Sequence, residues 1–206
     1  MPVEDASPAF AQAAAEDGIV LGFQSFDWLS EQGHFGLLKV AVDRRDPSLR
    51  EPVTAAVEAL TAIYDNLKGD SAVLQNLRAN LLLVVDLVHE PTGTLIELDE
   101  SLHFTSHRLA TFDLYPANTA LGFDLEEYRE LCRTLAPETD NLSHNLPAKG
   151  FGFGGVQRQR AYRDALRDLA TPAMGHPPLV RIIAVDGDGA AAYQRRREEL
   201  VTLLKP

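Results

Sequence analysis

The hydrophobic and polar positions of the chain predict helices that alternate with short strands. Apolar residues recur every three or four positions, as on the buried face of an α-helix, in four stretches: 48–68, the residues after 124, 156–171 and 190–204. Apolar or alternating runs typical of strands occupy residues 81–88, 94–99 and 178–185. This order predicts an α/β (α+β) fold in which helices flank a central mixed sheet.

Two further segments accompany these core elements. Residues 1–47 contain an alanine-rich stretch, residues 8–16, that predicts a short helix, and an apolar run, residues 33–42, that predicts a strand. Residues 104–150 separate the second core strand from the helix expected to follow it. We therefore interpret the chain as an N-terminal extension, followed by one domain over residues 48–206 with a helical insertion at 104–150.

Most of the candidate chemistry lies in the two strands that come first in the core. Asp86 stands in an apolar run, and Glu97 and Asp99 alternate with apolar residues in the next strand. If residues 90–93 form a four-residue hairpin loop, Asp86 faces Glu97 and all three carboxylates share one side of the sheet. A shift of one residue would instead place Asp86 opposite Ile96.

Three carboxylates on one face repel one another, and a divalent cation relieves that repulsion. Mg²⁺ typically binds one or two carboxylates and completes its coordination with water and phosphate oxygens. The pattern therefore predicts a Mg²⁺ or Mn²⁺ site that activates water against a phosphodiester. In the alternative interpretation the strand carboxylates face solvent, and Asp86 forms a structural ion pair with an arginine: Arg78, Arg108 or Arg181.

The spacing of these groups resembles that of the PD-(D/E)XK nuclease superfamily. Asp86 is followed after ten residues by Glu97-Leu98-Asp99 and then by His103, most like the branch that contains very-short-patch repair endonucleases. The later segments 157–163 (QRQRAYR) and 179–182 (LVRI) resemble the helix and strand that come next in that branch. The resemblance implies a restriction-endonuclease-like core and a metal-dependent deoxyribonuclease.

The resemblance also implies a role for each residue of the motif. Asp86 would be the principal metal ligand, and Glu97 the second, directly or through water. Asp99 stands where most of the superfamily has lysine, and His103 would assist proton transfer or position the attacking water. Further accessory candidates are Glu58 on the first core helix, Lys149 in a glycine-rich loop, and Arg108.

Three arginines share one side of the helix predicted at residues 156–171. Arg160, Arg163 and Arg167 lie nearly opposite its apolar stripe, at about 100° per residue. If the protein binds DNA, they are the first candidates for contacts with the phosphate backbone. Because Asp164 and Asp168 are interleaved with them, the alternative interpretation is an ordinary solvated helix face.

Composition narrows these interpretations. The net charge of −11 over 206 residues argues against a large non-specific DNA surface, because basic residues supply most of such affinity. The single cysteine, Cys132, excludes an intrachain disulfide framework and a multi-cysteine zinc site, and fits a reducing cytoplasm. We find neither a basic, apolar leader nor an apolar run of membrane-spanning length, so we expect a cytoplasmic protein without a membrane partner.

Two functional hypotheses follow from the sequence. The first is a metal-dependent endonuclease that hydrolyses DNA phosphodiester bonds with Mg²⁺ or Mn²⁺, in restriction, repair or defence. The second is a catalytically inactive nuclease-fold subunit that recognises a protein partner or forms a homodimer. Three features favour the second hypothesis. The net charge of the chain is negative, Asp99 stands where the motif has lysine, and Glu100 stands where it usually has glycine.

Overall fold

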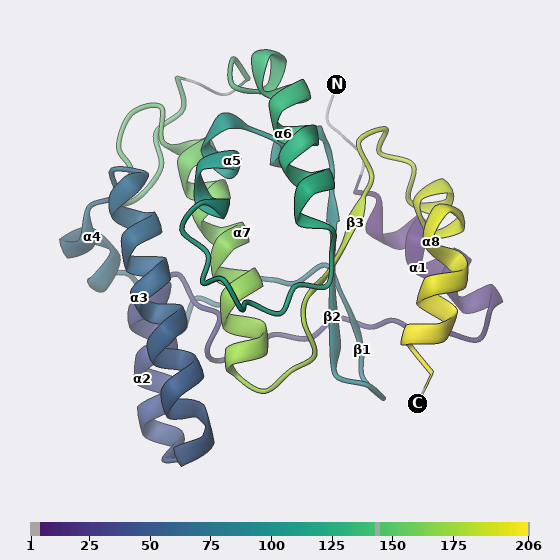
Figure 1. The fold of residues 1–206 in the computed structure, drawn as a ribbon, viewed down its shortest axis with the longest axis horizontal. Helices are drawn as coiled ribbons and strands as arrows, with labels where there is room; N and C mark the ends of the chain where they lie inside the picture. The colour runs from purple at the N-terminus through teal and green to yellow at the C-terminus, as the bar shows by residue number, and fades with distance from the viewer. Residues whose placement is uncertain (1–4, 143–144, 206) are drawn as a thin grey trace.

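The computed structural model describes residues 5–142 and 145–205 (Figure 1). Its helices are α1 (Ser7–Glu16), α2 (His34–Arg44), α3 (Arg50–Asn66), α4 (Ser71–Gln75), α5 (Ser106–Phe112), α6 (Leu125–Thr139), α7 (Val156–Ala173) and α8 (Gly189–Leu203). Its strands are β1 (Leu87–His89), β2 (Thr94–Asp99) and β3 (Val180–Ile183), and two short 3-10 helices lie at η1 (Pro47–Leu49) and η2 (Ser101–His103). The predicted α+β class with a mixed sheet is confirmed. No described helix is both long enough and apolar enough to cross a bilayer.

Strand β2 is the centre of the sheet, with β1 antiparallel on one side and β3 parallel on the other. The loop at residues 90–93 has the four residues that the sequence predicts, and His89 pairs with Thr94. Gly93 closes this loop with a φ of 69°, which glycine adopts without strain. The ladder stops at Leu87, so the next residue, Asp86, lies just beyond the pairing and beside Glu97.

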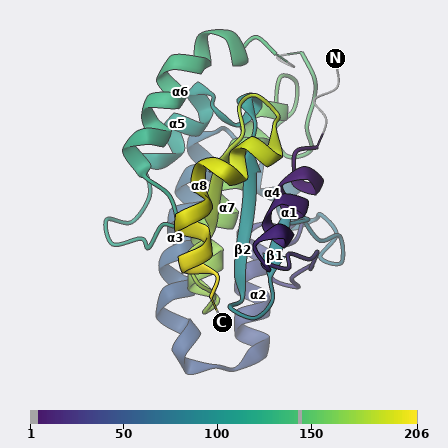
Figure 2. The ribbon, with the colours of Figure 1, turned by 90° about the vertical axis from the view of Figure 1, so that its right-hand side faces the viewer.

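The two faces of the sheet differ in character. One face is apolar and packs against α1 and α8, which lie over the strands in Figure 2, and its side chains come from every strand: Leu87, Ile96, Leu98, Val180 and Ile182. The other face carries charge and lies toward α7. Because Glu97 pairs in register with Arg181, and Asp99 follows two residues later, these three side chains share that face.

The predicted strand at residues 33–42 is wrong, because this segment forms helix α2. Leu37, Val40 and Ala41 lie at helical spacing and pack into the same core as α3. Helix α1 likewise packs against α8, as the two views of the fold show (Figures 1 and 2). Both helices of the predicted N-terminal extension therefore contact elements of the core.

The predicted strand at residues 81–88 is much shorter in the structure. Only its end, from Leu87, joins the sheet, while Leu83 donates its N–H to the carbonyl of Leu29 in a separate loop contact. Val84 is 66% exposed and lies outside the strand. The apolar run reflects a packed loop and not a strand covered on both faces.

His34, the first residue of α2, is buried beside α7. Its backbone N–H donates to the hydroxyl of Tyr162 at 3.0 Å, and that hydroxyl lies 2.9 Å from its own Nδ1. The hydroxyl accepts the backbone hydrogen and can give its own to Nδ1 of a neutral imidazole. Burial lowers the pKa of His34 to about 4.

We expect this histidine to remove stability at acidic pH. The unfolded chain binds a proton at the ordinary pKa of 6.5, whereas the folded chain resists it down to about 4. The neutral His34 ring therefore makes its full contribution to the free energy of unfolding above pH 6.5. That contribution falls by about 3 kcal/mol as the pH drops from 6.5 to about 4. Urea titrations of the wild type and His34→Asn should give unfolding free energies whose difference shifts by this amount between pH 7 and pH 4. A difference that is constant with pH would contradict the assignment.

Candidate functional site

A polar cavity of about 270 Å³ lies between the charged face of the sheet and the N-terminal half of α7. Most of its acidic groups and a histidine come from the sheet side and the N-terminus, and three arginines and Asp164 come from α7. The charged and polar lining residues are Asp5, Asp86, Glu97, Glu100, His103, Gln159, Arg160, Arg163, Asp164 and Arg167. Three of the predicted catalytic residues and all three predicted backbone-contacting arginines therefore line one cavity, although the helix follows the strands by some sixty residues.

Asp86 and Glu97 form the acidic wall of the cavity. Asp86 Oδ2 accepts the N–H of Leu98 at 2.8 Å, and the Asp86 N–H donates to Glu97 Oε1 at 3.3 Å. These contacts follow from the hairpin register, which sets the two residues side by side. Burial raises the pKa of both carboxyls, that of Glu97 to about 8. Burial thus disfavours the charged form of both groups, and a cation bound between them would favour it.

The arginines form the opposite wall. At spacings of three and four residues, Arg160, Arg163 and Arg167 project from one face of α7. Arg160 Nη1 donates to the Leu102 carbonyl at 3.2 Å, and Arg163 Nη2 lies 3.6 Å from Glu31 Oε1. All three line the cavity, so they can contact a bound anion such as a phosphate group.

His103 is the last residue of η2, four residues after Asp99 at the end of β2. Its Nδ1 lies 3.0 Å from Asp164 Oδ2 and 3.2 Å from Asp99 Oδ1, so two carboxylates hold the ring. Burial alone would lower the pKa of His103, but Asp164 and Asp99 outweigh it and raise that pKa. With Nδ1 held, Nε2 is the nitrogen that can exchange a proton with a molecule in the cavity.

Asp99 does not line the cavity, unlike the other predicted catalytic residues. It is 0% exposed, and its two oxygens lie 2.7 and 2.9 Å from Nη1 of Arg181. Tyr128 also donates its hydroxyl to Oδ2 at 3.0 Å. Asp99 therefore forms a buried ion pair and orients His103. Of the three carboxylates predicted to share one side of the sheet, Asp86 and Glu97 line the cavity and Asp99 does not. A structural pair with Arg181 does exist, but it involves this residue and not Asp86.

Two groups of side chains can be compared as metal sites. Asp99, His103 and Asp164 present donor atoms within 4.8 Å of one another, so this buried group could hold a metal ion. However, Arg181 already neutralises Asp99 and lies 3.7 Å from Asp164 Oδ1. Asp86 and Glu97 instead line the cavity, although Glu97 is 3% exposed and lies 3.1 Å from Nε of Arg167. Two carboxylates beside a cavity with room for water form a donor set that fits Mg²⁺ or Mn²⁺.

The accessory candidates lie outside the cavity. Arg108 is buried, with Nη2 2.5 Å from Asp168 Oδ2, and has a structural role. Lys149 has a side chain that is 68% exposed, and its Nζ lies 3.9 Å from Glu31. Glu58 is exposed on α3.

The sequence interpretation did not name Asp164 as a site residue, and its alternative for this helix was a solvated face. Asp164 and Asp168 are each 1% exposed, and both meet Arg181. Burial would raise the pKa of Asp164, but His103 and Arg181 outweigh it and hold that pKa below its usual range. The available signal was the spacing of four residues, which places both acids on one helical face toward a strand that carries arginine.

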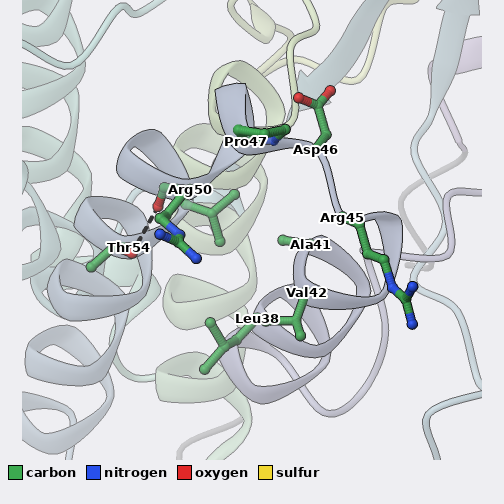
Figure 3. A pocket seen from close by; sticks show the side chains of 9 residues that line it. Leu38, Ala41, Val42, Arg45, Asp46, Pro47, Arg50 and Thr54 are labelled. Carbon is green, nitrogen blue, oxygen red and sulfur yellow. Dashed lines mark hydrogen bonds between the residues drawn. The ribbon is translucent and has the colours of Figure 1, made fainter.

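A larger hollow of about 520 Å³ lies between α2 and α3 (Figure 3). Its lining is mainly apolar, and its carboxylate belongs to Asp46, which accepts hydrogen bonds from the N–H and hydroxyl of Ser48 at the start of η1. Arg45 and Arg50 also line the hollow, but its lining holds one carboxylate and no histidine, unlike the cavity beside α7. We assign the candidate site to the polar cavity.

Comparison with known proteins finds a match to one family, whose function is unknown. Residues 62–146 match the model of a family of unknown function, DUF7255. The matched segment runs from within α3 to beyond α6 and so includes Asp86, Glu97 and His103, but not the arginines of α7. No curated protein and no solved structure matches the chain.

Proposed function

We propose that the protein is a metal-dependent nuclease that hydrolyses phosphodiester bonds of DNA. The observation that carries this proposal is the shared cavity, in which Asp86, Glu97 and His103 face the arginines of α7. One wall can bind a divalent cation, the other can bind phosphate, and a histidine lies between carboxylates that orient it. Metal-assisted hydrolysis of a phosphodiester can use all three functions.

The arrangement of elements supports a restriction-endonuclease-like core. Along the chain, α3 precedes the β1–β2 hairpin, and α7 leads into the parallel strand β3 and then α8. The same order underlies the resemblance to the PD-(D/E)XK superfamily, and the hairpin register brings its first two acids together.

The residues divide the reaction between them. Mg²⁺ held by Asp86 and Glu97 would supply Lewis-acid stabilisation and lower the pKa of bound water. Arg160 and Arg163 bind and orient the phosphate, whose charge matches their wall of the cavity. The raised pKa of His103 favours the charged ring, which carries a proton at Nε2. His103 gives that proton to the leaving oxygen of the phosphodiester.

One contact favours the alternative of an inactive nuclease-fold subunit. Arg167 Nε lies 3.1 Å from Glu97 Oε1, so a guanidinium stands next to the acid that would bind metal. Together with the absent motif lysine, this contact suits a site that holds an anionic partner without metal. Such a protein would bind neither Mg²⁺ nor Mn²⁺ and would cleave no nucleic acid.

The proposed activity is tested by comparing two glutamate variants. Wild type and Glu90→Gln, an exposed change in the hairpin loop, should cleave plasmid and single-stranded DNA with Mg²⁺ or Mn²⁺ and stop when EDTA is added. Glu97→Gln should cleave at least about tenfold more slowly, because it loses a cation ligand. RNA in parallel reactions tests the choice of DNA. No metal-dependent cleavage by the wild type, or equal rates for both variants, would reject the proposal.

A further inference from the structure

Arg167 differs from the other arginines of the cavity in the partner that it meets. Its side chain is 13% exposed, and its Nε lies 3.1 Å from Glu97 Oε1. Its Nη2 donates to the Val84 carbonyl at 2.8 Å. The guanidinium thus donates to the backbone through Nη2, while its Nε lies beside Glu97, a proposed cation ligand.

The contact with Glu97 is incomplete. Although Nε is close to Oε1, its geometry makes no hydrogen bond, and this buried atom has no other hydrogen-bond partner among residues 5–142 and 145–205. Asp164 Oδ1, 4.0 Å from Nη1 of the same guanidinium, is likewise buried without a hydrogen bond in the described chain. Arg167 therefore holds unused donor capacity inside a cavity that opens to solvent.

A divalent cation bound to the Glu97 carboxylate would be repelled by the Arg167 guanidinium beside the same carboxylate. Like charges a few ångströms apart repel strongly in a partly buried site. Arg167 must move away from Glu97 when the cation binds, and it then needs another anion. A phosphate group in the cavity supplies that anion, with oxygens that accept from a guanidinium at two points.

We propose that Arg167 couples cation binding to phosphate binding by exchanging Glu97 for a substrate phosphate. The inference rests on the proposed function, because it assumes that Asp86 and Glu97 bind the cation. By linkage, the cation strengthens phosphate binding by the same factor as phosphate strengthens cation binding. The free protein thereby holds the cation weakly until a phosphodiester arrives.

The experiment is a titration of Mn²⁺ into the intact chain, with free Mn²⁺ followed by electron paramagnetic resonance. It is run with and without saturating thymidine 5′-monophosphate, and a protein-free blank corrects for Mn²⁺ held by the nucleotide. In the wild type we expect the nucleotide to tighten Mn²⁺ binding by about five- to a hundredfold. Arg167→Met keeps the length of the side chain without its charge, so it should bind Mn²⁺ more tightly without nucleotide and show almost no coupling.

Two further variants separate this role from general charge or folding effects. Arg133→Met removes a charge from an exposed pair with Glu130, outside the cavity, so the variant should retain the coupling. Arg167→Lys keeps a cation beside Glu97 and should restore weak Mn²⁺ binding in the absence of nucleotide. It also provides a test if the methionine variant does not fold.

The outcomes distinguish this inference from the proposed function. Wild type that binds Mn²⁺ but shows no coupling, or coupling that survives in Arg167→Met, overturns the role of Arg167 and leaves the nuclease proposal standing. Wild type that binds no Mn²⁺ in either condition overturns both.

Discussion

Replacing Asp86 with asparagine is expected to slow DNA cleavage by about 10²–10³-fold while leaving the fold intact. The amide removes the negative charge that would hold the cation. The asparagine oxygen can still accept the N–H of Leu98, which Asp86 Oδ2 accepts at 2.8 Å. The loss should therefore appear in single-turnover cleavage rates with Mg²⁺ or Mn²⁺, and not in the thermal unfolding midpoint.

The matched control for this variant is Asp43→Asn. Asp43 is exposed on α2, so the same chemical change there should leave both cleavage and unfolding as in the wild type. Undiminished cleavage by the Asp86 variant would remove Asp86 from the site. A large drop in its unfolding temperature would instead assign the residue a structural role.

The second large effect concerns stability. Arg181 is 0% exposed, and besides pairing with Asp99 it places Nε 2.6 Å from Asp168 Oδ1. Arg181→Met keeps most of the volume but leaves these buried acids without their principal cation. We expect the free energy of unfolding to fall by about 3–5 kcal/mol in guanidinium chloride titrations at neutral pH.

A surface arginine provides the reference for that loss. Arg133 pairs with Glu130 at 3.2 Å, with side chains that are largely exposed, so Arg133→Met should cost less than about 1 kcal/mol. Equal losses in the two variants would show that the Arg181 network contributes no more than a surface pair. In the double variant Arg181→Met with Asp99→Asn, the loss should be smaller than the sum of the single losses, because the two residues are direct partners.

The sequence predicted the parts of the fold that local spacing determines. The apolar repeats of α3, α7 and α8 marked those helices, because a buried helical face requires apolar residues every three or four positions. The turn signals around Pro91 and Gly93 specified a four-residue loop, and that loop length placed Asp86 beside Glu97. The acidic half of the site was therefore predictable from one hairpin.

The remaining part of the site depends on contacts between distant segments. Arg181 is 82 residues from Asp99, and the parallel register that joins their strands leaves no local pattern in the sequence. For the same reason Asp164 and Asp168 looked like acids of a solvated face. Likewise, the run that ends at β1 is apolar because it packs as a loop, which residue periodicity cannot distinguish from a strand.

The central claim is that Asp86 and Glu97 bind a divalent cation in the cavity beside α7. The most direct test is an anomalous difference map from crystals of the protein grown with Mn²⁺ and thymidine 5′-monophosphate. We predict a peak within coordinating distance of carboxylate oxygens of both residues, about 2.0–2.2 Å from each oxygen that binds directly. No peak in the cavity, or one at Asp99, His103 and Asp164 alone, would contradict the account.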